Sequence, residues 1–178
     1  MKQLLTRTFS VVFFACMLFL QGCETDACQD VDCGVNGACF EGTCLCDPGY
    51  EGTDCNTVIR VEFLGDYEVE EDCAGSLFGP YNSEITGASD IDKVLIQNLG
   101  NYGCLDGMGN DIDYFVEATV STGGAIDFNM TTCTTTFEGS GSISTVGGVT
   151  TMIITYSATY DPGTGVTTDN CTATFTKF

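Results

Sequence analysis

The 178-residue sequence predicts a mainly β protein, in which a small disulfide-rich module precedes an antiparallel up-and-down β-barrel. The first observation is a cluster of six cysteines between residues 28 and 55. The second is a period-two alternation of apolar and polar residues through residues 57–178, which is the pattern of strands with one buried face. Gly-rich and Asx-rich turns divide this region into about eight strands, the size of a barrel or a β-sandwich. The short, meander-like turns favour the barrel over the sandwich.

The composition excludes several classes of function. The chain has 25 acidic and 5 basic residues, a formal charge of −20, and no histidine. A surface of this charge repels nucleic acid, and phosphate binding needs clustered basic residues. Without imidazole there is no Ser/His or Cys/His nucleophile pair and no His-ligated metal. We therefore expect a protein that is not an enzyme, with no cofactor, no metal and no nucleic-acid partner.

The N-terminal segment has the form of a secretory signal peptide. Lys2 and Arg7 come first, and the apolar run of residues 9–20 that follows is too short to span a bilayer. The run ends in residues 20–23 (LQGC), which resemble the bacterial lipobox. That resemblance implies cleavage before Cys23, which then carries diacylglycerol and usually a further acyl chain such as palmitate. Two or three acyl chains hold a protein firmly to a membrane, here the outer membrane or cell surface of a bacterium.

Cleavage would make the mature chain still more acidic. Removing residues 1–22 takes away two basic residues and no acidic one, so the formal charge moves from −20 to −22. Residues 23–27 then form a short acidic linker after the lipidated cysteine. Because an anionic membrane surface repels this polypeptide, we expect the lipid to supply the attachment.

The remaining cysteines divide the mature chain into two domains. Cys16 leaves with the signal peptide and Cys23 is used by the lipid, so ten of the 12 cysteines remain. An even number in an exported protein predicts disulfides, five in this chain. Six of these ten cysteines fall within residues 28–55, and four are widely spaced: Cys73, Cys104, Cys133 and Cys171.

The first group, residues 28–55, is spaced C-x4-C-x5-C-x4-C-x-C-x8-C and ends in CLCDPGYEGTDC, which resembles an EGF-like module. So short a segment cannot bury a sufficient core, so cross-links must hold it. A zinc site is disfavoured because exported thiols are oxidised and no C-x2-C pair occurs. The loop of residues 40–43 is also too short for the calcium-binding pattern of this family. The resemblance implies a protein-contact or spacer role, and the pairs Cys28 with Cys39, Cys33 with Cys44, and Cys46 with Cys55.

The second domain, residues 57–178, resembles the lipocalin-like domains of bacterial surface lipoproteins. Residues 63–67 (FLGDY) are similar to the first-strand G-x-W of lipocalins, with Tyr67 where Trp would stand. Residues 169–175 (DNCTATF) look like the Cys-containing, Thr-rich last strand of those domains. The family closes its barrel with a basic residue stacked on the Trp; the last strand here offers only Lys177, which departs from that pattern.

Closure of a barrel predicts how the four remaining cysteines pair. The first and last strands of a closed up-and-down barrel are antiparallel neighbours, so the end of one lies beside the start of the other. Cys73 ends the first strand, Cys171 begins the last, and both have the inward parity of their strands. We therefore expect a Cys73–Cys171 disulfide, which leaves Cys104 to pair with Cys133.

Two acid-rich groups in the second domain lack the spacing of a calcium loop, so we expect them to be solvated charge. Their members are Glu68, Glu70, Glu71 and Asp72, and Asp106, Asn110, Asp111 and Asp113. No two carboxylates are placed by the sequence in one cleft for glycoside chemistry.

The aromatic residues decide between two functions. Bulky inward rings would fill a small barrel, and we expect six of them: Phe63, Tyr67, Phe115, Phe128, Tyr156 and Phe175. A filled barrel favours a non-catalytic surface lipoprotein, in which the EGF-like module is a spacer or protein-contact element and the β domain is an interaction module. The alternative is a carrier that holds a small apolar ligand inside the barrel.

Overall fold

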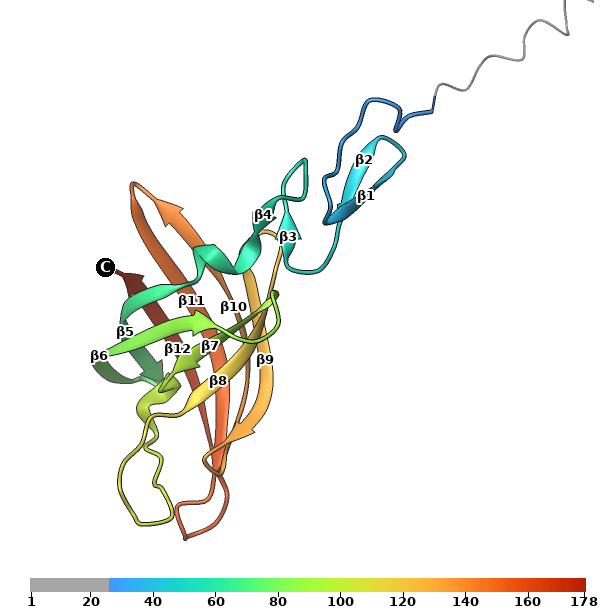
Figure 1. The fold of residues 1–178 in the computed structure, drawn as a ribbon. Helices are drawn as coiled ribbons and strands as arrows, with labels where there is room; N and C mark the ends of the chain where they lie inside the picture. The colour runs from blue at the N-terminus through green and yellow to red at the C-terminus, as the bar shows by residue number, and fades with distance from the viewer. Residues whose placement is uncertain (1–25) are drawn as a thin grey trace, which may run out of the picture.

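The structure, a computed structural model, describes residues 26–178; the predicted signal peptide and the lipidation site Cys23 lie outside this range. Its N-terminal part is a small module of two short antiparallel pairs (Figure 1). The pairs are β1 with β2 and β3 with β4, with bounds Gly37–Phe40, Thr43–Cys46, Tyr50–Glu51 and Thr57–Val58. Because β3 pairs with β4, the sheet structure of the module extends to Val58.

Three disulfides take the place of a hydrophobic core in this module. They join Cys28 to Cys39, Cys33 to Cys44, and Cys46 to Cys55, with Cα atoms 5.8, 5.4 and 5.2 Å apart. These are the pairs that the resemblance to EGF-like modules implies. The apolar side chains buried within the module belong to two of these cysteines, Cys33 and Cys55. The cross-links therefore do most of the work of holding this short segment in its fold.

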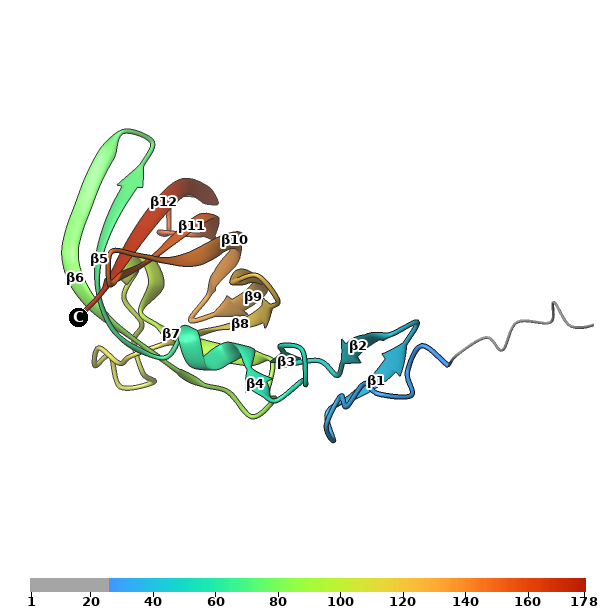
Figure 2. The ribbon, with the colours of Figure 1, turned by 90° about the horizontal axis from the view of Figure 1, so that it is seen from above.

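Eight strands follow and close into an antiparallel barrel, which Figure 2 shows curling around a common axis. Each strand pairs with the next along the chain, and β12 returns to pair with β5. The predicted up-and-down barrel is thus confirmed, and the β-sandwich alternative is wrong. The strands β5 to β12 span, in order, Gly65–Cys73, Ser76–Gly87, Lys93–Gln97, Phe115–Ser121, Ala125–Thr132, Thr135–Val146, Val149–Tyr160 and Thr167–Lys177.

The closing seam between β5 and β12 is held at both ends. At one end Cys73 lies opposite Cys171, and their Cα atoms, 4.1 Å apart, are joined by a disulfide, the pair expected from barrel closure. At the other end Lys177 lies opposite Tyr67, with its Nζ 5.8 Å from the centre of the tyrosine ring. The same ammonium group donates a hydrogen bond of 3.2 Å to the backbone oxygen of Glu62. The seam therefore combines a covalent link with a cation–π contact.

The inside of the barrel is filled by apolar side chains. The largest of those fully buried are Tyr67, Phe63, Phe137 and Phe175. Five of the six rings expected inside are buried, and the expectation for Phe115 is wrong, because this residue is 41% exposed. Successive side chains of a strand point to opposite faces, so the buried Val116 directs its neighbour Phe115 outward.

A single turn of 3₁₀ helix, η1 (Ile59–Glu62), joins the module to the barrel. The Ile59 N–H donates to the backbone oxygen of Gly49 over 3.0 Å. Arg60 Nη1 donates to the backbone oxygens of Ala88 and Asp90 in the β6–β7 turn, both over 2.9 Å. Gly49 packs so closely on this turn that a Cβ there would lie 2.5 Å from Ile91 Cγ2. The module is thus fastened to this end of the barrel by hydrogen bonds and packing.

A second 3₁₀ turn, η2 (Leu99–Asn101), follows β7 and lies at the opposite end of the barrel. Leu99 is fully buried there and closes that end of the core. Across residues 26–178, no helix combines the length and the apolar character that crossing a bilayer requires. The end that η2 covers carries the candidate site described next.

Candidate functional site

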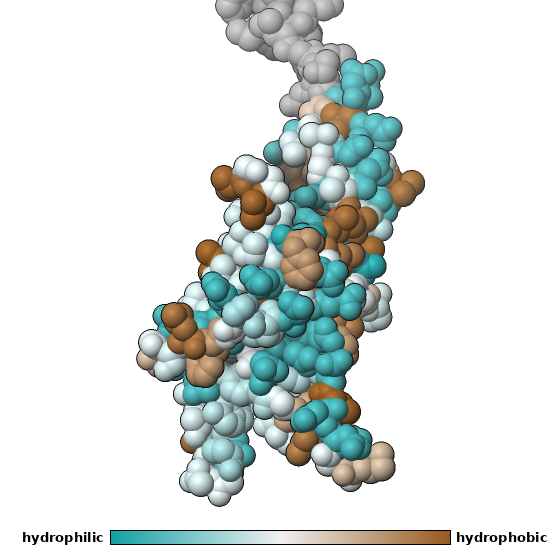
Figure 3. All heavy atoms as spheres, turned by 90° about the vertical axis from the view of Figure 1, so that its left-hand side faces the viewer, coloured by the Kyte–Doolittle hydropathy of each residue, from teal (hydrophilic) through white to brown (hydrophobic). Residues whose placement is uncertain are grey.

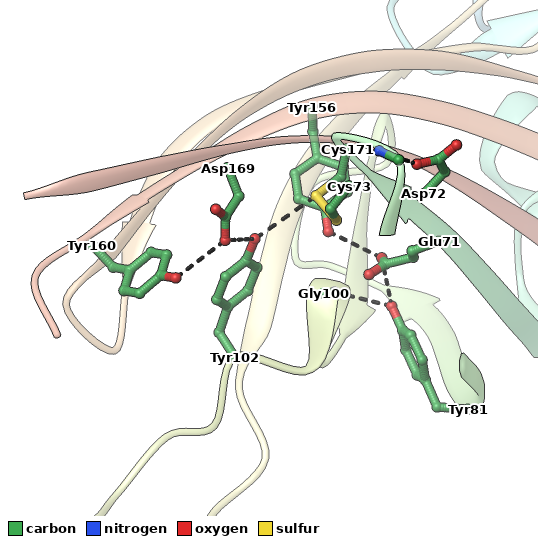
Figure 4. The surroundings of a disulfide bond; sticks show 11 residues. Glu71, Asp72, Cys73, Tyr81, Gly100, Tyr102, Tyr156, Tyr160, Asp169 and Cys171 are labelled. Carbon is green, nitrogen blue, oxygen red and sulfur yellow. Dashed lines mark hydrogen bonds between the residues drawn. A yellow bond between two sulfur atoms is a disulfide. The ribbon is translucent and has the colours of Figure 1, made fainter. Parts of the chain in front are cut away.

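A cavity of about 530 Å³ opens at the η2 end of the barrel, away from the EGF-like module. Strand β5 and the start of β6 supply one side, η2 and the residue after it a second, and the β11–β12 ends a third. The lining residues are Glu71, Cys73, Phe78, Gly79, Pro80, Tyr81, Gly100, Asn101, Tyr102, Tyr160 and Asp169. Aromatic rings and two carboxylates thus meet beside the disulfide of the closing seam (Figure 4).

Glu71 is the buried acid of this site. Its residue is only 2% exposed, and its Oε1 accepts hydrogen bonds from the hydroxyls of Tyr81 (2.8 Å) and Tyr156 (3.0 Å). The Tyr81 hydroxyl in turn accepts a hydrogen bond of 2.9 Å from the Gly100 N–H. The expectation that Glu71 is solvated charge is therefore wrong, although Glu70 and the rest of its acid-rich group are exposed. Glu71 has the inward parity of its strand, which places its carboxylate inside the barrel end.

Asp169 is the second acid of the site and lies on β12. Its Oδ2 accepts hydrogen bonds from the hydroxyls of Tyr102 and Tyr160, each over 3.2 Å. The rings of these two tyrosines are tilted against each other, with their centres 5.2 Å apart. The Tyr102 hydroxyl also lies 3.9 Å from the sulfur of Cys171, so the acid, the two rings and the disulfide form one connected cluster.

Burial sets the protonation of this cluster. It raises the pKa of Glu71, although the hydrogen bonds from Tyr81 and Tyr156 act in the opposite direction. Burial also raises the pKa values of Tyr81 and Tyr156, and the negative charge of Glu71 raises them further. For Tyr102, burial and the charge of Asp169 raise the pKa in the same way. The tyrosines therefore remain O–H donors to the two carboxylates at neutral pH.

Replacing Glu71 with Gln should raise stability at neutral pH. A carboxyl whose pKa is raised on folding contributes stability below its unfolded pKa and loses it as pH rises through the folded value. We therefore expect Glu71→Gln and the native chain to have similar free energies of unfolding at about pH 4. At about pH 8 the variant should be the more stable of the two. Urea unfolding of both proteins at the two pH values measures this. The exposed Glu70→Gln removes the same charge and should show no such pH-dependent gain; an equal gain there would contradict the explanation.

In the second acid-rich group, Asp106 and Asn110 form a turn within the loop of residues 103–113, and Asp113 accepts a hydrogen bond from the Asn98 side chain over 2.6 Å. The Asp106 carboxylate accepts hydrogen bonds from the backbone N–H groups of Met108 and Asn110 and from the Asn110 side chain. The side-chain bond from Asn110 is the main cause that lowers the pKa of Asp106. Within residues 26–178, no group of three or more Cys, Asp or Glu side chains converges as it would around a metal ion.

The fifth disulfide ties this loop to the barrel. Cys104, in the loop, is bonded to Cys133 in the β9–β10 turn, and their Cα atoms are 5.5 Å apart. This is the pair left over once Cys73 is joined to Cys171, as the sequence-based argument expects. The disulfide draws the residues after η2 toward the β9–β10 turn.

Reasoning from the sequence did not identify the candidate site. Tyr81, Tyr102, Tyr160 and Asp169 are separated by as many as 88 positions, and only barrel closure brings them together. One signal was nonetheless available. Glu71 alternates in phase with Val69 and Cys73, and a carboxylate at an inward strand position indicates either hydrogen-bond partners or a site.

Comparison with known proteins identifies the N-terminal module. Residues 28–58 match the Teneurin-like EGF domain family. L-selectin of Rattus norvegicus is 36% identical over 70 residues, which is 29% of this chain and 19% of the rat protein. The chain thus spans only about a fifth of the length of this relative. The module is EGF-like, in agreement with its cysteine spacing and its disulfides.

A solved structure resembles a larger part of the chain. It is a crystal structure of a protein of unknown function from Bacteroides ovatus, with 14% sequence identity and a TM-score of 0.45. The match covers 65% of this chain and 41% of the Bacteroides chain. The present chain thus spans less than half the length of that protein.

Proposed function

We propose that this chain is a non-catalytic lipoprotein anchored in the envelope of a bacterium, at the outer membrane or cell surface. Lipid on Cys23 supplies the anchor, the EGF-like module is a spacer or protein-contact element, and the barrel is an interaction module. The LQGC sequence at residues 20–23, after a short apolar run, supports the anchor.

The filled barrel is the observation that carries the interaction role. A carrier of the lipocalin type needs an open interior, whereas the inside of this barrel is packed with rings such as Phe137 and Tyr67. The contact between Lys177 and Tyr67 supports the lipocalin-like resemblance of the strands without requiring a ligand in the core. Contacts with other molecules are then made by the outer surface and the rim. Figure 3 shows one face on which hydrophilic residues are mixed with residues of intermediate hydropathy and scattered hydrophobic ones.

The arrangement of the domains suits a tethered binding protein. The chain leads from its N-terminus through the EGF-like module to the barrel, and the cavity lined by Glu71 and Asp169 lies at the far end (Figure 1). Because Arg60 and Gly49 fasten the module to the barrel, the module can act as a spacer that holds the barrel in a fixed position. A lipid on the N-terminal side would hold this cavity toward the surroundings of the cell.

The EGF-like module also has a surface suited to protein contact. Three of its large apolar side chains are strongly exposed: Val35 at 90%, Phe40 at 60% and Leu45 at 58%. Phe40 and Leu45 lie on the two strands of one hairpin, β1 and β2. Apolar side chains gathered on so small a domain favour a binding surface over bare solvent exposure.

The anchor is tested by changing Cys23 to Ser in a bacterium that acylates lipoproteins. Mass spectrometry of the native protein should show Cys23 as the first residue, carrying acyl chains, and the variant should move from the membrane fraction to the soluble fraction. Cys16→Ser changes a cysteine of the segment that is removed, so it should leave the distribution unchanged. An unmodified Cys23, or a variant that stays in the membrane fraction, would contradict the proposal.

A further inference from the structure

We propose that the cavity at the η2 end of the barrel binds an organic cation, an alkylammonium group held by the rings of Tyr81, Tyr102 and Tyr160 and by the carboxylates of Glu71 and Asp169. This inference goes beyond the proposed function because it assigns a ligand class to one place on the barrel. It does not depend on the lipid, so either idea can fail without the other.

The walls of the cavity have the chemistry that recognises ammonium groups. Tyr102 and Tyr160 form a tilted pair beside Asp169, and Phe78, which is 55% exposed, adds a further ring to the lining. Aromatic faces attract cations through their negative quadrupole, and the attraction is stronger where water is excluded. The tyrosine hydroxyls donate to carboxylates, which polarises these rings and makes their faces more negative.

The carboxylates add a directed negative charge. Both tyrosine hydroxyls at Asp169 reach the same oxygen, Oδ2, so these two bonds leave Oδ1 unoccupied. The Glu71 carboxylate is more fully engaged, because Tyr81 and Tyr156 both donate to its Oε1 and the Gly100 N–H also acts on it as a hydrogen-bond donor. Figure 4 shows Asp169 next to the hydroxyl of Tyr102 and Glu71 between Tyr156 and Tyr81. Asp169 thus retains an oxygen, away from its tyrosines, for a positively charged partner, and Glu71 adds buried acid nearby.

Charge distinguishes this ligand class from others. The lining includes no Lys or Arg, and the chain contains no His, so nothing there would pair with an anion. An apolar ligand would leave the Glu71 charge desolvated and without a counter-ion. A cation removes that penalty, and the strongly negative chain attracts it from solution. Burial of Glu71, which raises its pKa, agrees with a site that lacks its positive partner.

Calorimetric titration of the full chain in dodecyl maltoside tests the proposal, with choline chloride as the probe. The comparison ligand is 3,3-dimethylbutan-1-ol, which has the shape of choline with carbon in place of the charged nitrogen. We expect choline to bind about tenfold more tightly than the alcohol. The same titration is repeated with N-acetyl-lysine methylamide. If this compound binds more tightly than choline, the ammonium group comes from a lysine of a protein partner. If it binds more weakly, the ligand is a free cation.

Three variants locate the site. Glu71→Gln and Asp169→Asn should each weaken choline binding about tenfold. Asp169 is only half-buried, so its variant tests the site independently of the buried Glu71. Glu70→Gln removes an equal charge from the outer face of the same strand and should leave binding unchanged. Equal affinity for choline and the alcohol, absence of choline binding, or an equal loss in all three variants would overturn the proposal.

Discussion

Replacing Cys73 and Cys171 with Ala should lower the free energy of unfolding of the barrel by about 4.7 kcal/mol. The disulfide closes a loop of 98 residues, so its loss releases a large conformational entropy in the unfolded chain. It also joins the first and last strands of the barrel, where no short turn holds neighbouring strands together. Urea unfolding followed by tyrosine fluorescence measures the change, because every tyrosine except Tyr50 lies in the barrel.

The Cys104–Cys133 disulfide provides the matched control. It closes a loop of 29 residues, so the same substitution of both cysteines should cost about 3.6 kcal/mol. The two variants also differ in which strands lose a covalent link, because the control leaves the β5–β12 seam intact. A larger loss for the Cys104–Cys133 variant would show that loop length and seam position do not control the stability of this barrel.

Changing Phe137 to Ala should destabilise the barrel by about 3 to 5 kcal/mol. Phe137 is fully buried, stacks on Tyr114 with ring centres 5.8 Å apart, and meets the rings of Tyr102 and Tyr156. Its removal opens a gap in a packed core and releases three rings that lie against it. Because Tyr102 and Tyr156 also bond to the acids of the cavity, the near-ultraviolet circular dichroism of the native state should change as well.

Phe115→Ala is the control for this core substitution. Phe115 is 41% exposed on the outer face of β8, so its loss should cost less than about 1 kcal/mol. Thermal and urea unfolding of both variants make the comparison. Similar losses in the two variants would mean that burial in the barrel does not set the contribution of these rings.

Much of the fold could be predicted from local features of the sequence. The spacing of six cysteines in residues 28–55 indicates the EGF-like module, since so short a segment can be held only by cross-links. Period-two alternation places residues such as Tyr67, Val69 and Phe175 on the inner face without knowledge of their partners. Closure of an antiparallel meander then brings Cys73 opposite Cys171, because the first and last strands must be neighbours.

Parity along a strand has to be applied strictly, and two expectations failed where it was not. Phe115 was expected inside because it is large and aromatic, although its neighbour Val116 occupies the inward position. Glu71 was expected in solvent because it is charged and has acidic neighbours, although it alternates in phase with Val69. In both cases the alternating geometry of the strand outweighs the preference of the single side chain.

The candidate site was decided only by the tertiary structure. Glu71, Tyr102 and Asp169 come from the first strand, from the turn after η2 and from the last strand. Their meeting depends on barrel closure, on the path of the chain after η2 and on the Cys104–Cys133 link. Sequence patterns report the face on which a residue lies, because that follows from local backbone geometry. They do not report which distant loops converge at the end of the barrel, because that follows from how the whole sheet closes and packs.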